Sequence, residues 1–164
     1  MREDFQFPLP GRARIAIIDA DFRAASGMRT FRFGDDSALC GFAPDSLALP
    51  LNSALALADR KLRRLIDLPG LKRGIVVLTD ELMLPHHRDL IWKAFGLPIF
   101  EQLRDEHGRI IARECEVHDG LHFDPSLIAS LEEIAEINRG VCECGAETPR
   151  LQRLLVTTSQ AAAA

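Results

Sequence analysis

Residues Gly74 to Gly96 read GIVVLTDELMLPHHRDLIWKAFG and give the clearest indication of the fold. The residues from Ile75 to Thr79 are apolar or β-branched and are followed by Asp80. This pattern is typical of a buried strand. Pro85 then suits the first position of a helix, and Gly96 suits the position just past its end. The apolar residues between them recur on one helical face: Leu90, Ile91, Ala94 and Phe95. This region predicts a strand followed by an amphipathic helix.

The residues before it repeat this alternation. Ile15 to Ile18 is a short, wholly apolar run, as expected of a strand buried on both faces. A helix is predicted after Asn52, its expected N-cap, up to the Pro69-Gly70 pair. Its apolar face consists of Leu55, Ala58, Leu62, Leu65 and Ile66. Strands that alternate with helices predict an α/β fold, with a mostly parallel sheet flanked by helices.

The second half adds a strand over residues 109–117, after a turn at residues 105–108. Asp124 and Pro125 have the pattern of an N-cap and first position of a third helix, which is expected to run to Gly140. Its apolar stripe consists of Leu127, Ile128, Leu131, Ile134 and Ala135. We predict a single α/β domain over residues 1–157, with a small C-terminal zinc-binding lobe at about 113–151. Residues 158–164 are expected to form a disordered tail.

Composition excludes several functional classes. The chain has 164 residues, a net charge of −4 and no apolar segment long enough to span a membrane. The N-terminus lacks the pattern of a signal peptide, so a cytoplasmic protein is expected. The negative charge argues against a nucleic-acid partner. In a cytoplasmic chain, four cysteines indicate free thiols or metal ligands in preference to disulfides.

Cysteines and histidines cluster in two short segments. Residues 113–122 read RECEVHDGLH, and residues 142–145 read CECG. Zinc sites commonly take two ligands from each of two segments. Cys115 with either His118 or His122, together with Cys142 and Cys144, therefore predicts a Zn²⁺ site. Spacing alone leaves the choice of histidine open.

The zinc is expected to be structural. Three thiolates and a histidine would close the coordination sphere, and thiolate donation weakens the Lewis acidity that activates water. The alternative is a catalytic zinc with an open water position, at which Glu116 or Glu143 would act as a base. Cys40 lies between apolar residues, so we expect it to be buried in the core.

Three segments resemble the phenylacetate:CoA ligase branch of the adenylate-forming (AMP-binding) enzymes. They are GIVVLTDELMLPHHRDLIWKAFGLPIFEQL, HGRIIARECEVHDGLHFD and CECGAETPRL, within Leu71 to Leu151. The resemblance implies a zinc held by four residues: Cys115, His122, Cys142 and Cys144. It leaves His118 as an alternative ligand, expected in the outer shell or in solvent.

The chain departs from that family where the chemistry takes place. The family's phosphate loop is rich in Ser, Thr and Gly and is followed by Lys, but AASGMRT (24–30) is short and lacks the lysine. The chain contains no tyrosine, so the family's Tyr-Gly-x-Thr-Glu segment survives at most as Glu106 and Gly108. Catalytic and nucleotide-binding residues stay unassigned. We therefore expect a zinc-stabilised, ligase-like domain that lacks independent adenylation activity and acts as a binding or assembly module, with another protein chain as its partner.

Two alternative functions are kept. The first alternative is a subunit of a split acyl- or aryl-CoA ligase. The other is a haloacid-dehalogenase-like phosphatase. The second alternative rests on IAIIDADFR, in which Asp19 and Asp21 follow an apolar strand, and on Thr79 at the end of another. In that class one aspartate attacks phosphate and a second acts as an acid, with magnesium present.

Overall fold

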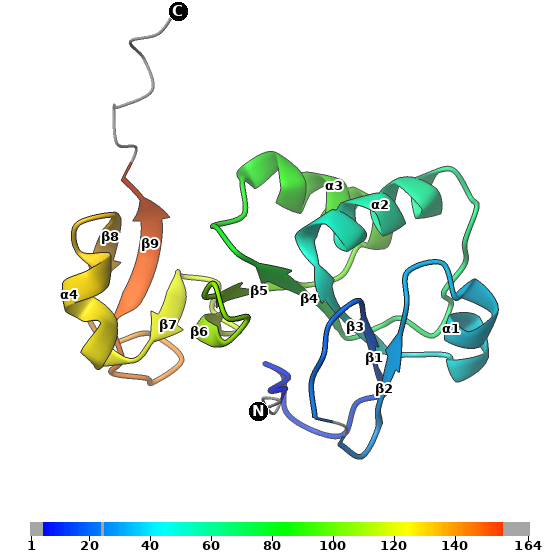
Figure 1. Ribbon diagram of the computed structural model, residues 1–164, viewed down its shortest axis with the longest axis horizontal. Coiled ribbons are helices and arrows are strands. Elements are labelled where there is room, and N and C mark those ends of the chain that lie inside the picture. The colour runs from blue at the N-terminus through cyan, green and yellow to red at the C-terminus, as the bar shows by residue number, and fades with distance from the viewer. Residues whose placement is uncertain (1–4, 24, 156–164) are drawn as a thin grey trace, which may run out of the picture.

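The computed structural model describes residues 5–23 and 25–155, which form one nine-stranded sheet with helices against it (Figure 1). The strand order is β2-β1-β3-β4-β5-β6-β7-β9-β8. The strands are β1 (Ile15–Ile18), β2 (Met28–Phe31), β3 (Ser46–Pro50), β4 (Gly74–Thr79), β5 (Ile99–Arg104), β6 (Ile110–Glu114), β7 (Leu121–Phe123), β8 (Ala135–Asn138) and β9 (Arg150–Leu154). The helices are α1 (Asp36–Phe42), α2 (Leu51–Leu62), α3 (Pro85–Phe95), the 3₁₀ helix η1 (Pro125–Leu127) and α4 (Ile128–Leu131).

The first five strands form a parallel half with two apolar faces. Figure 1 shows α2 and α3 on one side of these strands and the N-terminal segment on the other. Ile75 and Val77 of β4 join the cluster beneath the helices, whereas Val76 and Leu78 pack with Phe5 of the N-terminal segment. Because side chains alternate along a strand, a strand covered on both sides must be apolar throughout. This explains the uninterrupted hydrophobic run of β4.

Several predicted elements are confirmed with small shifts. The strands predicted at Ile15–Ile18 and from Gly74, and the helix from Pro85, occur as β1, β4 and α3. Gly96 follows α3 with a left-handed φ of 63°, as its place past the helix end predicts. The helix predicted after Asn52 begins at Leu51 and ends at Leu62, before the expected stop. It ends early because Arg64 takes a positive φ of 58°, which a helix cannot contain.

The prediction of a mostly parallel sheet is wrong. Pairing is parallel from β2 to β5 but antiparallel from β5 through β6, β7 and β9 to β8. The change occurs at the turn of residues 105–108, where the Asp105 carboxylate accepts hydrogen bonds from the amides of His107 and Arg109. A connection this short permits only an antiparallel return, because a parallel crossover needs a dozen or more residues.

The third predicted helix is also wrong over most of its length. Asp124 does cap a helical start, since its Oδ1 accepts a hydrogen bond from the Ser126 amide. The helical part stops at Leu131, and Ala135–Asn138 forms strand β8 in its place. Pairing with β9 satisfies the backbone of β8 and buries Ala135. Residues spaced for one helical face therefore end in a strand because a distant segment is available to pair with them.

No helix among the described residues is long and apolar enough to cross a membrane. The predicted tail, residues 158–164, lies outside the described residues, and the division into one domain with a C-terminal lobe stays a prediction.

Candidate metal centre

Four side chains from two distant segments meet at one end of the antiparallel half. Cys115 follows β6, His122 belongs to β7, and Cys142 and Cys144 lie in the loop between β8 and β9. Their sulfur and nitrogen atoms all lie within 4.8 Å of one another. The structure thus brings together the four residues that the family resemblance implies, and His118 lies outside the group.

The first ligand segment is a tight turn between antiparallel strands. The His118 amide donates to the Cys115 carbonyl at 3.1 Å, and His118 itself has a positive φ of 57°. Gly120 has a φ of 83°, and a Cβ there would lie 2.8 Å from the Leu151 carbonyl oxygen of β9. Only glycine fits this close approach without displacement of the backbone. The turn places Cys115, just after β6, close to His122 of the neighbouring strand β7.

The second ligand segment is a compact knuckle. The Cys142 amide donates to the Ala146 carbonyl at 3.0 Å, and the Gly145 amide donates to the Cys142 carbonyl at 2.8 Å. Gly145 has a φ of 88°, which an L-residue rarely adopts. These bonds fold the chain so that the thiols of Cys142 and Cys144 face the same space, although only one residue separates them.

Two of the distances between the donor atoms are close to those around a tetrahedral zinc ion. With Zn–S bonds of about 2.3 Å and a Zn–N bond of about 2.0 Å, tetrahedral angles put two sulfurs about 3.8 Å apart and sulfur and nitrogen about 3.5 Å apart. The Sγ atoms of Cys115 and Cys142 lie 3.8 Å apart. Cys144 Sγ lies 3.6 Å from His122 Nε2. The four residues therefore form a Cys₃His group that could hold a metal ion.

Thr148 orients the histidine of this group, and sequence reasoning missed it. Its Oγ1 lies 2.9 Å from His122 Nδ1. A proton on Nδ1 that donates to this hydroxyl leaves the lone pair of Nε2 free for a metal, which is the usual support of a histidine ligand. Thr148 lies four residues after Cys144 in the sequence, but only the pairing of β7 with β9 reveals the contact.

The thiols of Cys115 and Cys142 have different pKa values. Burial, together with the neighbouring thiols of Cys144 and Cys142, raises the pKa of the Cys115 thiol to about 11. The backbone amide of Cys144 lowers the pKa of the Cys142 thiol to about 6, and the side chains of Cys144, His122 and Arg150 act in the same direction. Metal binding must therefore displace protons from this site.

His118 is exposed and belongs to a network around two buried glutamates, Glu101 and Glu114, which joins the ligand turn to α3. Its Nδ1 lies 3.0 Å from Glu114 Oε1, and its ring stacks on Phe100 with centroids 4.9 Å apart. Glu114 Oε2 accepts from Arg88 of α3 at 3.0 Å and from the Glu101 amide at 2.8 Å. Burial raises the pKa of Glu101, against hydrogen bonds from the Met83 amide and the Thr79 hydroxyl. No local pattern in the sequence indicates these contacts.

The remaining candidate residues have different surroundings. Glu116 and Glu143, the candidate bases of a catalytic zinc, are both exposed. Cys40 is exposed, so the prediction of a buried thiol is wrong. Helix α1 buries Leu39, and the next residue on a helix lies about 100° around the axis, away from that contact.

The aspartates of the phosphatase alternative lie in the parallel half. Asp19, with a φ of 51°, accepts from the Phe33 amide through Oδ1 and from the Ser53 hydroxyl through Oδ2, both at 2.9 Å. Asp19 thus connects the end of β1 to the start of α2, and Asp21 is exposed. The hydroxyl of Thr79 donates to Glu101 on β5. This geometry gives the phosphatase alternative no support.

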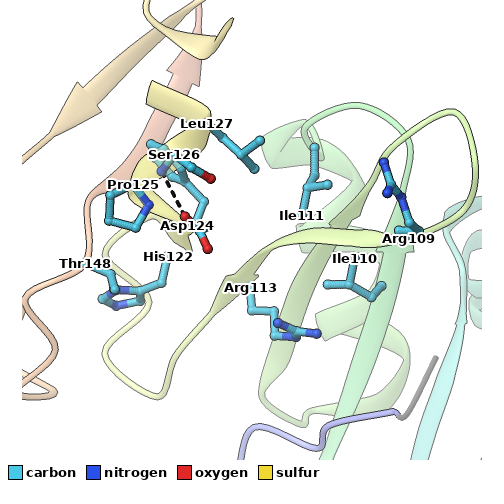
Figure 2. Close-up of a pocket in the computed structure, with 11 residues that line it drawn as sticks. Arg109, Ile110, Ile111, Arg113, His122, Asp124, Pro125, Ser126, Leu127 and Thr148 are labelled. Atoms are coloured by element: carbon cyan, nitrogen blue, oxygen red, sulfur yellow. Dashed lines mark hydrogen bonds between the residues drawn. The ribbon is translucent and has the colours of Figure 1, made fainter. Parts of the chain in front are cut away.

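A pocket of about 650 Å³ opens beside the metal group, between β6 and the turn that follows β7 (Figure 2). His122 and Thr148 lie at one end of the pocket. Arg113 of β6 and Arg109 of the turn before β6 also line it. Apolar walls come from Ile111, Phe123 and Leu127. Arg109 pairs with Asp105 through Nε at 2.7 Å.

Comparison with known proteins gives a fold relationship. Neither a protein-family model nor a curated protein sequence matches the chain. The fold is similar to that of 2-hydroxyisobutyryl-CoA ligase in an open conformation with 2-HIB-AMP and CoA, with a TM-score of 0.60 and 14% identity over 93% of this chain. The same ligase in its thioesterification state gives a TM-score of 0.62 and 15% identity over 94% of this chain. In both comparisons the match covers 44% of the ligase chain. The chain therefore has a ligase-like α/β fold and spans less than half the length of the ligase.

Proposed function

We propose that this chain is a zinc-stabilised, ligase-like domain that acts as a binding or assembly module and does not adenylate a substrate by itself. The observation that carries the proposal is the convergence of Cys115, His122, Cys142 and Cys144 within 4.8 Å. Three soft thiolates with one imidazole favour zinc over the hard cations magnesium and calcium. Four protein donors complete a tetrahedron, so the ion is assigned a structural role.

The fold and the sequence support the ligase-like part of the proposal. The resemblance to the phenylacetate:CoA ligase branch names the same four ligands, and the structural similarity is to a CoA ligase. The sequence offers neither a lysine-bearing phosphate loop nor any tyrosine for an adenine contact. We assign the module to the cytoplasm, with another protein chain as its partner. In the variant form of the proposal, that partner completes a split acyl- or aryl-CoA ligase.

Two measurements on the purified chain test this proposal. Metal analysis is expected to find one zinc per chain. An ATP–pyrophosphate exchange assay with a panel of aryl and short acyl acids is expected to give no activity above background. If the purified chain contains no zinc, the stabilising role of the metal is refuted. If the chain alone catalyses ATP–pyrophosphate exchange, it is an enzyme. A thermal shift with AMP, without activity, would favour the split-ligase variant.

A further inference from the structure

Arg150 is a nearly fully buried guanidinium between the two ligand segments. Its side chain is 4% exposed, and Nη1 donates to Asp119 Oδ2 at 2.7 Å. Nη2 donates to the Gly140 carbonyl at 3.4 Å. Asp119 lies in the turn that connects Cys115 to His122, whereas Gly140 lies two residues before Cys142. One side chain therefore bonds to both segments.

The backbone of Arg150 occupies the same central place. It pairs with His122 of β7 on one side and with Asn138 of β8 on the other. Gly120 lies close against this strand, since a Cβ there would lie 3.3 Å from the Cβ of Arg150. Both ligand segments thus depend on the position of this residue.

The positive charge of the guanidinium would also offset the charge of a zinc site loaded with metal. Three thiolates and a neutral imidazole around Zn²⁺ leave one negative charge in excess, and a buried charge requires a partner. Asp119 is half exposed, so water screens part of its charge. The Nε–H of Arg150 has no hydrogen-bond acceptor among the residues that the structure describes. A neighbouring thiolate of the loaded site would supply one.

We propose that Arg150 is a positioning residue of the metal site, which ties the two ligand segments together and offsets the excess negative charge of the loaded centre. This inference rests on the proposed zinc site. Residues outside the first coordination sphere commonly contribute 10- to 100-fold to metal affinity, because they hold the ligands in place.

The test compares zinc affinities by competition with a chromophoric chelator. Arg150→Met keeps most of the side-chain volume and removes the charge and the bonds, so we expect zinc to bind about 10- to 100-fold more weakly. Arg150→Lys keeps the charge and is expected to recover part of the loss. The matched control is Arg153→Met on the same strand, which removes an exposed pair with Glu136 and is expected to bind zinc normally. Cobalt(II) replaces zinc in a second readout, since its visible bands report the ligand geometry.

A changed cobalt spectrum in Arg150→Met supports the positioning role, whereas a general loss of stability would leave the bands of the loaded site unchanged. If Arg150→Met does not fold, Asp119→Asn at the half-exposed partner is expected to weaken zinc binding in the same direction by a smaller factor. Wild-type affinity in whichever of these variants folds, or unchanged cobalt bands, overturns the inference. Failure of the wild-type protein to bind either metal instead refutes the zinc proposal itself.

Discussion

The Sγ atoms of Cys115 and Cys142 lie 3.8 Å apart, although 27 positions separate them in the sequence. The contact exists because β9 pairs with β7 and β8 and draws the second ligand segment against the first. Two thiols at this distance, with a third thiol and an imidazole beside them, have the spacing of ligands around one tetrahedral ion. The antiparallel half and the proposed metal site therefore depend on each other.

Substitution of single ligands should abolish stoichiometric zinc binding. Cys142→Ser and His122→Ala each remove one of four donors, so we expect the zinc content after dialysis to fall from one per chain to a small fraction. Metal analysis by mass spectrometry measures this directly. His118→Ala and Cys40→Ser serve as controls and should keep a full complement of zinc, since both residues lie outside the four-residue group. Loss of zinc in His118→Ala, with retention in His122→Ala, would reverse the choice of histidine.

Removal of zinc should loosen the antiparallel half selectively. Structural zinc contributes on the order of 10 kcal/mol to the apparent stability of small sites, and here the ion would join two segments of the antiparallel half. After treatment with a chelator, hydrogen exchange should accelerate over residues 113–151 and change much less in β3 and β4. Readdition of zinc should restore protection. Equal protection with and without metal would contradict a structural role.

Glu101 should make stability depend on pH. Burial raises the pKa of this carboxyl in the folded state, so its contribution is fully present below the unfolded pKa of about 4.3 and is lost as pH rises through the folded pKa. Glu101→Gln cannot ionise. Relative to the wild type, the free energy of unfolding of this variant should therefore improve from about pH 5 to about pH 8. Urea titrations at both pH values measure the difference. Glu106 is the control, because its side chain is 86% exposed. Glu106→Gln should leave the pH dependence of the unfolding free energy unchanged.

Two neighbouring residues of α3 should differ sharply on truncation. Ile91 is fully buried against the parallel strands, so Ile91→Ala should cost about 2–5 kcal/mol of unfolding free energy. Trp92 is 56% exposed, and Trp92→Ala should cost much less despite the larger side chain that is removed. Chemical denaturation of both variants checks the orientation of the helix. Similar losses for the two variants would show that α3 does not turn Ile91 toward the parallel strands and Trp92 toward solvent.

The parts of the fold that the sequence predicts are those specified by local patterns. The strand at Gly74, the helix at Pro85 and the strand at Ile15 each carry their own periodicity and end signals, and the structure confirms them. The segment after Leu131 could not be predicted in this way, because its apolar residues suit a helix and only pairing with β9 makes it a strand. The antiparallel half was missed for the same reason.

In the candidate site, too, local sequence patterns predict some residues, and contacts between distant segments determine the others. Residue chemistry and spacing single out the cysteines and leave two histidines as alternatives. Thr148 and Arg150 acquire their roles through contacts across β7 and β9, which no local spacing records. Exposure of Cys40 likewise depends on which face of α1 packs against the sheet.

Zinc K-edge X-ray absorption of the purified protein would identify the ligands of the proposed ion directly. We expect an ordered first shell of three sulfurs at about 2.3 Å and one nitrogen at about 2.0 Å, with no bound water. A protein purified without zinc that also fails to take it up, or a first shell made mainly of oxygen and nitrogen, would contradict the assignment of Cys115, His122, Cys142 and Cys144 as a closed structural site.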